Sequence, residues 1–494
     1  MTVAQSLLDR LDDPTLLCTN AFIGGEHVSK GADGAHFAVH NPANGEVLAE
    51  LPDLGAEAVN TAVDSAYEAQ RAWAATTGTH KSDTLKVWHR LWVENADDLA
   101  TIMTAEQGKP LAEAKGEVLY GASFLEWYSE EAKRIYGDTI PGHREDTRIL
   151  VLKEPVGVVG AITPWNFPNA MIARKVAPAL ATGCAMVAKP AAETPLSTLA
   201  LAVLAERAGL PMELFSVVTA SRGAPIGDAM TSNPRVAKIT FTGSTEVGRQ
   251  LMRQGADQIK KLGLELGGNA PFIVFEDADI DAAVQGALQS KYRNAGQTCV
   301  CTNRIYVQSG IVKEFTKALA TAVAEMQVGD GFGENVDIGP LINEASVQKV
   351  SEHIEDAVVR GGTVETGGET HSAGPLFFKP TVISGATDDM LIAHEETFGP
   401  VAPIFTFDNE AEVIERANDS EFGLAGYFFS RDVARVFRVA EGLKTGMIGV
   451  NTGLISTAVA PFGGVKQSGI GREGSRYGAE DYLNIKYVCL GGIT

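Results

Sequence analysis

Cysteine is scarce in this sequence. The 494 residues include five cysteines, namely Cys18, Cys184, Cys299, Cys301 and Cys489. An odd number of cysteines spread over a long chain fits reduced thiols in a cytoplasm better than an oxidised disulfide framework. We therefore expect a cytoplasmic protein that folds without disulfide bonds, in which a thiol is free to have a chemical task.

Long apolar runs are also missing. The longest candidate, residues 176–188, has 13 residues and contains Thr182 and Gly183, whereas a helix needs about 20 apolar residues to span a bilayer. The first residues, MTVAQSLLDRLDDP, contain no basic segment followed by an apolar core. The sequence therefore predicts neither a signal peptide nor a transit peptide, and no membrane association.

Positive charge is in short supply as well. Lysine and arginine number 41 against 62 aspartate and glutamate residues, which leaves a net charge of −21. Such a surface repels phosphate backbones and anionic lipid headgroups, so we expect neither nucleic acid nor membranes as partners. Any anionic small molecule that binds must be met by local arginine or lysine side chains.

Length and apolar content, by contrast, are ample. At roughly 150 residues per domain, the chain corresponds to about three folding units. Hydrophobic residues make up 45% and charged residues 21% of the sequence, a balance that suits large buried cores rather than disorder. We find no internal repeat and no low-complexity tract.

The apolar pattern predicts two successive α/β units. A helix with one apolar face is expected at 56–73, and from Leu150 onward short apolar runs alternate with helical stretches, which indicates βαβ units and a parallel sheet. The first series has expected strands at 156–162, 185–188, 214–218 and 236–241 and expected helices at 169–181, 197–208 and 245–254. The second series has expected strands at 270–275 and 304–307 and expected helices at 279–294 and 312–328.

Two segments fall outside these series. The polar stretch 137–147 interrupts the first one, and residues 482–490 are expected to form a strand without a local partner. Because such strands often pair between subunits, we expect a homo-oligomer.

Two glycine-rich segments are candidates for binding phosphate. A literal G-x-G-x-x-G spans 469–474, but no buried strand precedes it and 20 residues follow it, so we interpret it as a structured loop rather than a dinucleotide fingerprint. The better candidate is FTGSTEVG at 241–248, which follows an expected strand and opens an expected helix, where backbone N–H groups can face a pyrophosphate. Taken alone, this turn also fits an ordinary helix cap.

Three further residues indicate a nucleophilic site. Cys299 follows an expected helix in the polar turn RNAGQTC, where a nucleophilic and a structural thiol fit about equally well. Glu265 stands between leucines at the end of an apolar strand, where burial would raise the pKa of its carboxyl toward neutrality, as a base that activates water requires. Asn166 lies between aromatic residues and prolines in TPWNFP, which makes its amide a candidate oxyanion donor. Each residue also fits a purely structural role.

Together these segments resemble the aldehyde dehydrogenase superfamily, from about Phe22 to the C-terminus. The matching motifs are TPWNFP at 163–168, KPA from Lys189, FTGS at 241–244, LELGGN at 264–269, GQTC at 296–299, EETFGP at 395–400 and PFGG from Pro461. The resemblance implies an α/β fold with two Rossmann-like parallel-sheet domains, one for the cofactor and one catalytic, plus a small β oligomerisation element. It divides the chain into an NAD(P)-binding domain (1–125 and 147–262), a catalytic domain (263–468) and an oligomerisation element (126–146 and 469–494).

The resemblance also implies roles for individual residues. Cys299 is expected to be the nucleophile, Glu265 the base, and Asn166 the oxyanion donor together with the backbone N–H of Cys299, with Lys175 beside them. An aldehyde would form a thiohemiacetal on Cys299, lose a hydride to the cofactor and leave a thioester, which water activated by Glu265 hydrolyses. No metal is expected. The residues expected to bind the cofactor are Thr163, Pro164, Trp165, Lys189, Ala192, Gly223, Gly243, Ser244, Gly248, Leu266, Glu396, which would hold the nicotinamide ribose, and Phe398.

Within the superfamily, the chain is most similar to the succinate-semialdehyde dehydrogenase family. The likeness lies in MIARK from Met171, YRNAGQTCVC from Tyr292 and TGLIS from Thr452. It implies that Arg174, Arg293 and Ser456 bind the distal carboxylate of the substrate, and that a homotetramer or dimer oxidises succinate semialdehyde to succinate with NAD(P), a step of GABA catabolism. Cys301 matches a redox partner of the nucleophile, but a disulfide across one residue is strained, so a spare thiol remains the alternative.

The cofactor preference depends on the position three residues after Lys189. NAD-preferring relatives carry an acid there that hydrogen-bonds the adenosine ribose, whereas this chain has Ala192, with Glu193 one position later. Without the acid, a 2′-phosphate can lie beside Lys189, which favours NADP. Because alanine offers that phosphate no hydroxyl group, NAD remains an alternative.

Three alternatives for the function stay open. A neighbouring semialdehyde such as glutarate semialdehyde differs by one methylene, which changes binding by only about 1–3 kcal/mol. A cysteine hydrolase would also use Cys299, although no histidine lies near it in the sequence. A non-catalytic protein that retains the fold is the third alternative.

Overall fold

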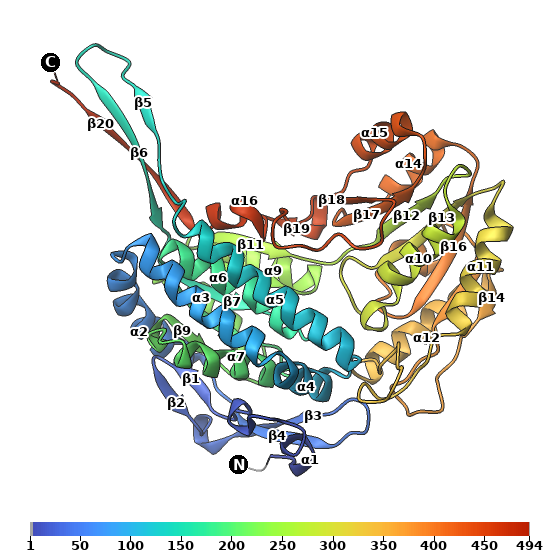
Figure 1. Cartoon of the computed structure of the whole chain (residues 1–494), viewed down its shortest axis with the longest axis horizontal. Helices are drawn as coiled ribbons and strands as arrows, with labels where there is room; N and C mark the ends of the chain where they lie inside the picture. Colours follow the sequence, from blue (N-terminus) through green and yellow to red (C-terminus); the bar gives the residue numbers. More distant parts are fainter. Residues whose placement is uncertain (1–2, 494) are drawn as a thin grey trace.

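Residues 3–493 form two α/β units that lie side by side, each built on its own sheet, and an arm that projects from the first unit (Figure 1). They are described in a computed structural model. Residues 1, 2 and 494, which fall at the ends of the predicted divisions of the chain, lie outside this description.

The first unit contains an eight-stranded sheet in the order β19-β11-β10-β7-β8-β9-β1-β2. The five strands from β11 to β9 in this order run parallel to one another. β19 and β1, which flank them, are antiparallel to them, and β2 pairs antiparallel with β1. The strands are β1 (Ala21–Ile23), β2 (Glu26–Val28), β7 (Val158–Ile162), β8 (Ala185–Lys189), β9 (Phe215–Val217), β10 (Val236–Thr242), β11 (Lys261–Glu265) and β19 (Gly469–Ile470).

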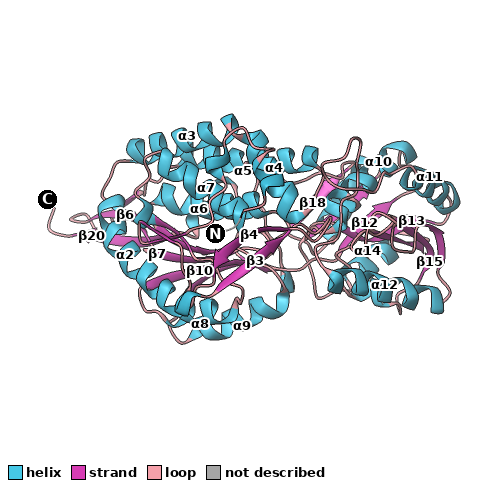
Figure 2. Ribbon diagram, turned by 90° about the horizontal axis from the view of Figure 1, so that it is seen from below, coloured by secondary structure: helices cyan, strands magenta, loops and turns pink. Residues whose placement is uncertain are grey.

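Helices cover both faces of this sheet: Figure 2 shows α3, α5 and α7 on one face and α8 and α9 on the other. The central helix α6 is buried along its whole length, although it contains Arg174 and Lys175. It begins at Pro168, a residue suited to a first helical turn, and ends at Gly183, whose φ of 96° closes the helix. The helices are α2 (Ala56–Ala74), α3 (Gly78–Glu94), α4 (Ala96–Gln107), α5 (Leu111–Glu131), α6 (Pro168–Thr182), α7 (Pro195–Arg207), α8 (Ala224–Ser232), α9 (Thr245–Ala256) and α16 (Ser475–Glu480), with a short α1 (Gln5–Leu8) near the start of the chain.

The second unit contains a seven-stranded sheet in the order β14-β15-β16-β13-β12-β17-β18. All neighbours in it are parallel except β14, which pairs antiparallel with β15. Its strands are β12 (Ala270–Val274), β13 (Thr302–Gln308), β14 (Thr363–Thr366), β15 (Thr381–Ala386), β16 (Val401–Phe407), β17 (Ala425–Phe429) and β18 (Met447–Val450). Its helices are α10 (Ile280–Lys291), α11 (Val312–Ala324), α12 (Glu344–Val359), α13 (Leu391–His394), α14 (Glu410–Asn418) and α15 (Val433–Gly442).

Two smaller sheets complete the chain. A hairpin of β3 (His36–His40) and β4 (Val47–Pro52) lies near the N-terminus, and the projecting arm consists of β5 (Thr139–Pro141), β6 (Arg148–Pro155) and β20 (Leu483–Leu490) (Figure 1). β20 pairs antiparallel with β6 along its full length, from Leu483 opposite Pro155 to Leu490 opposite Arg148. The expectation that residues 482–490 lack a partner in their own chain was therefore wrong, because a local pattern cannot show pairing between distant segments.

Most of the predicted α/β elements are confirmed with shifts of one to four residues at their ends. α10 ends at Lys291 instead of continuing to residue 294, because Asn294 and Ala295 have left-handed φ angles of 54° and 55°. Among residues 3–493 we find no helix with the length and apolar character that crossing a membrane would demand.

The predicted domain limits differ from the structure at three places. Helix α5 continues to Glu131, so residues 126–131 are not part of the arm. β11 belongs to the first sheet, so the second unit begins after Glu265 rather than at residue 263. β19 pairs with β11 of the first sheet, and α16 packs on α5 and α6 of the first unit as well as on β20, so neither belongs to the arm alone. The roles assigned to these divisions remain predictions.

Candidate active site

The carboxyl ends of the parallel strands β7 to β11 meet at one edge of the first sheet. From β7 the chain passes to β8 on one side, while β10 lies on the other, and in α/β sheets ligands bind at the carboxyl edge where the order reverses in this way. The structure brings most of the predicted cofactor residues to this edge. After β7 come Thr163, Pro164 and Trp165. Lys189 is the last residue of β8, and Ala192 follows that strand. Gly223 caps α8 after β9, Gly243 and Ser244 follow β10, and Leu266 follows β11.

Unpaired donors at this edge fit a dinucleotide. The Ser244 side chain accepts a hydrogen bond from the backbone N–H of Val247 at 3.4 Å and so caps α9. The ammonium group of Lys189 is almost buried, yet it donates no hydrogen bond to any described residue. Burial lowers the pKa of Lys189, while the carboxylates of Glu193 and Asp53 raise it. A helix N-terminus beside an unsatisfied cation suits phosphate and ribose oxygens.

The structure shows a packing constraint at Gly248, whose contact with the cofactor stays a prediction. It lies inside α9, where a Cβ atom would overlap the side chain of Leu266. The close approach of α9 to the chain leaving β11 therefore accounts for this glycine, as in the third glycine of dinucleotide-binding folds, which serves packing.

A loop of the second unit closes over the same edge. Glu396 follows α13, and its Oε1 accepts a hydrogen bond from the backbone N–H of Gly268 at 3.1 Å. Its backbone oxygen accepts from Lys349 Nζ at 2.6 Å. Burial raises the pKa of Glu396 to about 7. Nearby, the ring of Phe398 packs edge-to-face on Trp165 with a centroid distance of 5.6 Å, so the loop reaches the segment that follows β7.

The nucleophile turn is held in an unusual backbone conformation. Residues 294–296 all have positive φ angles, and Gly296 is required there because a Cβ would overlap the backbone oxygen of Gly399. The side-chain amide of Asn166 donates to the backbone oxygen of Gln297 at 3.0 Å, two residues before Cys299. An amide has two N–H groups, so one remains, and the N–H of Cys299 meets no acceptor in the part of the chain that the structure describes. Two donors are thus left for an oxyanion.

The loop after β11 packs closely against the backbone of Cys299. A Cβ on Gly268 would overlap the backbone oxygen of Cys299, so only glycine fits. Glu265, at the end of β11, is buried, and its Oε2 lacks a hydrogen-bond partner within residues 3–493. Burial and the charge of Glu473 raise the pKa of Glu265 well above its usual value, although Arg174 and Lys175 lower it.

The thiol of Cys299 lies in the same electrostatic environment. Burial raises its pKa to about 12; the charge of Arg174 lowers it, and the carboxylates of Glu396 and Glu265 raise it further. The ionisation of Cys299 therefore depends on both predicted carboxylates and on one predicted substrate-binding arginine.

Arg174 and Lys175 share one carboxylate that the sequence did not single out. Both form ion pairs with Glu473, which comes from the G-x-G-x-x-G segment, and Lys175 Nζ also donates to Thr242 Oγ1 at 2.6 Å. The Arg174 guanidinium lies over the ring of Phe462, 4.3 Å from its centroid. Its Nη1 and Nη2 have no hydrogen-bond partner among the described residues. A single acid next to a glycine gives no sequence signal that distinguishes a buried carboxylate from a solvated one.

Arg293 packs on a different aromatic ring from Arg174. Its guanidinium faces the ring of Phe167, 5.2 Å from the centroid, and it lines a cavity of about 530 Å³ together with Glu113 and Leu454. Burial raises the pKa of Tyr120, and the charges of both arginines lower it. The Tyr120 hydroxyl group has no hydrogen-bond partner among the described residues. Ser456, in contrast, lies half-buried in the loop after β18 and makes no hydrogen bond to either arginine within the described chain.

Cys301 is buried two residues beyond the nucleophile. Its thiol donates to the backbone oxygen of Lys291 at 3.5 Å, and burial raises its pKa. Burial lowers the pKa of the neighbouring Lys291 to about 8. All five cysteines are free.

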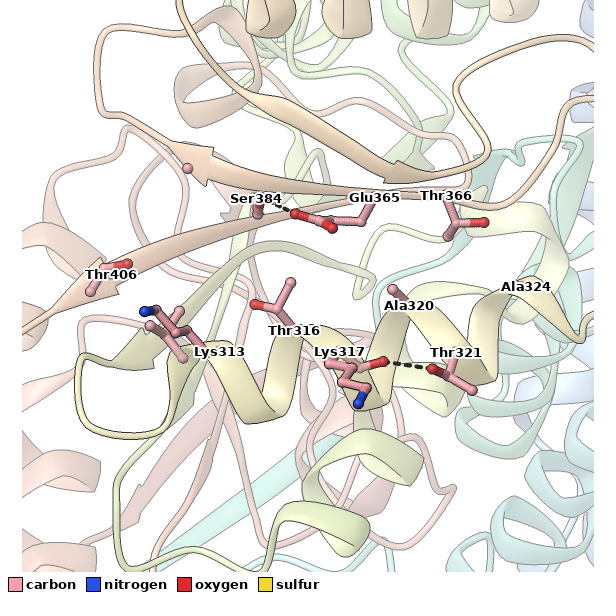
Figure 3. A pocket seen from close by; sticks show the side chains of 12 residues that line it. Lys313, Thr316, Lys317, Ala320, Thr321, Ala324, Glu365, Thr366, Ser384 and Thr406 are labelled. Carbon is pink, nitrogen blue, oxygen red and sulfur yellow. Dashed lines mark hydrogen bonds between the residues drawn. The ribbon is translucent and has the colours of Figure 1, made fainter.

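Other hollows help to delimit the site. The one in Figure 3, about 610 Å³, lies between α11 and strands β14 to β16 and is lined by residues such as Lys313, Lys317 and Glu365, none of which was predicted for this site. A cavity of about 870 Å³ includes Ala192, Glu193 and Ser221 and so adjoins the cofactor edge. Within residues 3–493 no group of three or more His, Cys, Asp or Glu side chains is arranged to hold a metal ion.

Comparisons with known proteins agree with this arrangement. The model of the aldehyde dehydrogenase family matches residues 28–488. A glutarate-semialdehyde dehydrogenase of Pseudomonas aeruginosa is 59% identical over 98% of this chain and 100% of its own length. A succinate-semialdehyde dehydrogenase [NADP(+)] of Escherichia coli is 57% identical, with the same two coverages. The crystal structure of a succinate-semialdehyde dehydrogenase from Burkholderia pseudomallei superposes with a TM-score of 0.96 at 56% identity, covering 97% of this chain and 99% of that one.

The contact at Gly268 yields a test. Replacing Gly268 with alanine forces a methyl group against the Cys299 carbonyl, and because overpacking in a tight core costs about 1–3 kcal/mol, we expect a lower Tm. A misplaced nucleophile should also lower aldehyde turnover by about 100-fold. In the control Gly116→Ala, on α5, a Cβ meets nothing within 4 Å, so turnover should hold, and Tm should not fall because alanine is the better helix former. Equal turnover in the two variants would contradict the role of this contact.

Proposed function

The chain belongs to the aldehyde dehydrogenase family, and on this premise we propose that it oxidises succinate semialdehyde to succinate with NADP. The observation that carries this proposal is Arg174, whose buried guanidinium has two nitrogens without a partner among the described residues and whose charge reaches the Cys299 thiol. A buried cation with unsatisfied donors is costly. A substrate with a carboxylate at the far end from its aldehyde would satisfy those donors and leave the aldehyde at Cys299.

The chain's own residues divide the reaction as follows. Cys299 adds to the aldehyde carbon as a thiolate after its proton leaves for solvent; burial raises its pKa to about 12, and the charge of Arg174 lowers it. Negative charge then develops on the aldehyde oxygen, facing the second N–H of Asn166 and the N–H of Cys299. When bound, NADP supplies the hydride acceptor. Glu265 subsequently deprotonates the water that hydrolyses the thioester.

Glutarate semialdehyde is the second candidate substrate. The relative from Pseudomonas aeruginosa at 59% identity carries that activity in its name. Arg293 lines an open cavity of about 530 Å³ rather than a closed wall, which leaves room for one additional methylene. We propose Arg293, with Ser456 from the facing loop, as the more distant part of the carboxylate site.

NADP is the favoured cofactor and NAD the alternative. Ala192 leaves the position after β8 without an acid, and the nearly buried ammonium group of Lys189 has no protein partner in the described chain. Glu193 and Asp53 both influence Lys189, however, and their negative charge would oppose a 2′-phosphate. A relative that is 57% identical is named for its use of NADP(+).

We further propose the cytoplasm as the site of action, in accord with five free cysteines. A role in GABA catabolism would follow from the substrate. Cys301 is retained as a redox partner of Cys299, because it lies two residues further along the chain and its charge raises the pKa of the Cys299 thiol.

The arm is proposed as the surface through which subunits assemble into a dimer or tetramer. Several of its exposed side chains are apolar. Ile485 and Tyr487 on β20 are 75% and 61% exposed, and Tyr136, which precedes β5, is 71% exposed. Exposed apolar side chains that gather on one element mark interaction surfaces. β20 and β5 are the outer strands of the arm and leave edges free for pairing.

Assembly is tested by charging this surface. Ile485→Lys combined with Tyr487→Lys places two cations on one face of β20 and should shift the sedimenting species to a lower mass. Asn484→Lys adds a charge to the opposite face of the same strand and should leave the mass unchanged. A double variant that sediments like the wild type would contradict the proposed surface.

The substrate proposal is tested by following the absorbance of reduced cofactor with three- to six-carbon aldehydes and semialdehydes. We expect the four- and five-carbon semialdehydes to be preferred over plain aldehydes. Arg174→Met and Arg293→Met should each lower kcat/KM for semialdehydes by about 100-fold, since losing one partner of a buried charge pair costs about 2–5 kcal/mol. Their activity on plain aldehydes should change little. Arg293 is half-buried, so its variant stays informative if the Arg174 variant is unstable.

The matched control for both arginines is Arg235→Met, which removes an exposed arginine paired with Asp64. It should keep the wild-type selectivity. No reduced cofactor with any aldehyde would remove the dehydrogenase function, and unchanged selectivity in both active-site variants would remove the carboxylate site.

A further inference from the structure

Lys109 binds the backbone of the segment that contains Asn166. It lies between α4 and α5, and its Nζ donates to the backbone oxygen of Asn166 at 2.7 Å. The same ammonium group forms an ion pair with Glu117 in which both side chains are 1% exposed. It also lies 4.0 Å from the centroid of the Phe167 ring. The predicted oxyanion donor is thus attached to a charge pair that water does not reach.

Glu117 fixes the other end of this segment. Its Oε1 accepts hydrogen bonds from the backbone N–H groups of Asn169 at 3.0 Å and Ala170 at 3.2 Å, in the first turn of α6. The Lys109–Glu117 pair therefore contacts the backbone on both sides of Phe167 and sets the path of residues 166–170.

Asn294 joins this segment to the nucleophile turn. Its side-chain amide donates to the backbone oxygens of both Asn166, at 3.1 Å, and Gln297, at 3.2 Å. Its backbone N–H donates to Glu113 Oε2 at 2.9 Å, which supports the left-handed conformation of the turn. Two side chains of α5, Glu113 and Glu117, thereby anchor the two backbone segments that supply the oxyanion donors.

We propose that Lys109 is a positioning residue for the oxyanion site: it fixes the peptide group of Asn166 so that the free amide N–H of Asn166 and the N–H of Cys299 point to one place. This inference rests on the proposed function. Hydrogen-bond satisfaction alone does not account for Lys109, because Asn294 already donates to the same carbonyl oxygen. Stability alone does not account for it either, since an apolar pair of similar size is often as stable as a buried ion pair.

The test compares Lys109→Met with the neutral double variant Lys109→Met/Glu117→Gln. The double variant leaves no uncompensated buried charge, and the amide oxygen of the glutamine can still accept from Asn169 and Ala170. The control is Lys81→Met, which removes another nearly buried lysine that donates to backbone oxygens, those of Ala74 and Thr76, away from the site.

Three quantities are measured: kcat and KM for the semialdehyde with NADP, and the rate at which iodoacetamide alkylates Cys299. We expect kcat of the double variant to fall by about 10- to 100-fold, as small displacements of catalytic groups do, with little change in KM. Alkylation forms no oxyanion, so its rate should stay near the wild-type value. Adding Asn166→Ala should cause no further loss beyond that of Asn166→Ala alone, because both changes act through one donor.

Each contrary result is decisive. An unchanged kcat, a fall in kcat matched by an equal fall in alkylation, or losses that multiply with Asn166→Ala would overturn the role of Lys109. A wild-type protein that alkylates normally but oxidises no aldehyde would instead refute the proposed function, and the role of Lys109 with it.

Discussion

The backbone contact between Gly268 and Cys299 is the constraint on which the site depends. Residues 266–269 carry the chain from β11, the last parallel strand of the first sheet, to β12, in the middle of the second. In this short crossing, Gly268 donates to Glu396 and leaves no space for a side chain beside the Cys299 carbonyl. Glu265 directly precedes the crossing. The nucleophile and the two carboxylates with distinct predicted roles are therefore positioned by one segment, and their geometry is set by how the two α/β units meet.

Charge is organised in the opposite way inside and outside the molecule. The chain as a whole carries −21, which disfavours anions at long range, but the interior next to Cys299 holds two cationic side chains, Arg174 and Lys175, against one paired carboxylate, Glu473. Burial and the charge of Glu473 raise the pKa of Glu265, so this carboxyl gives up its proton less readily than a solvated one. An anionic aldehyde thus meets positive charge only after it enters the site, where the low dielectric strengthens the attraction.

Local sequence pattern was sufficient for most strands and helices of the two units, because hydrophobic periodicity and turn residues act over a few residues. It placed the end of α10 too late, since Asn294 and Ala295 adopt left-handed conformations that their residue types do not announce. It also missed the pairing of β20 with β6, which joins segments far apart in the chain. Long-range contacts of this kind leave no periodic signal.

The residues of the candidate site likewise divide into those that the sequence predicted and those that only the fold reveals. Cys299, Glu265 and Asn166 could be predicted because each lies in a short motif whose residue types indicate its chemistry. Glu473 and Lys109 could not, because a charged residue in a glycine-rich or proline-flanked loop is normally solvated, and only the fold reveals that both are buried and paired. At Gly248 the fold adds a packing constraint against Leu266 that no sequence pattern indicates, and its contact with the cofactor stays a prediction.

The roles of Cys299 as nucleophile and Glu265 as the base that activates water are tested most directly by mass spectrometry. The Glu265→Gln variant is mixed with succinate semialdehyde and NADP and then measured. Without the base that activates water, the acyl group should remain on the enzyme. We expect a succinyl thioester on the peptide that contains Cys299, together with a single equivalent of reduced cofactor per active site. An acyl group on another residue, or continued turnover with no acylated peptide, would contradict these roles.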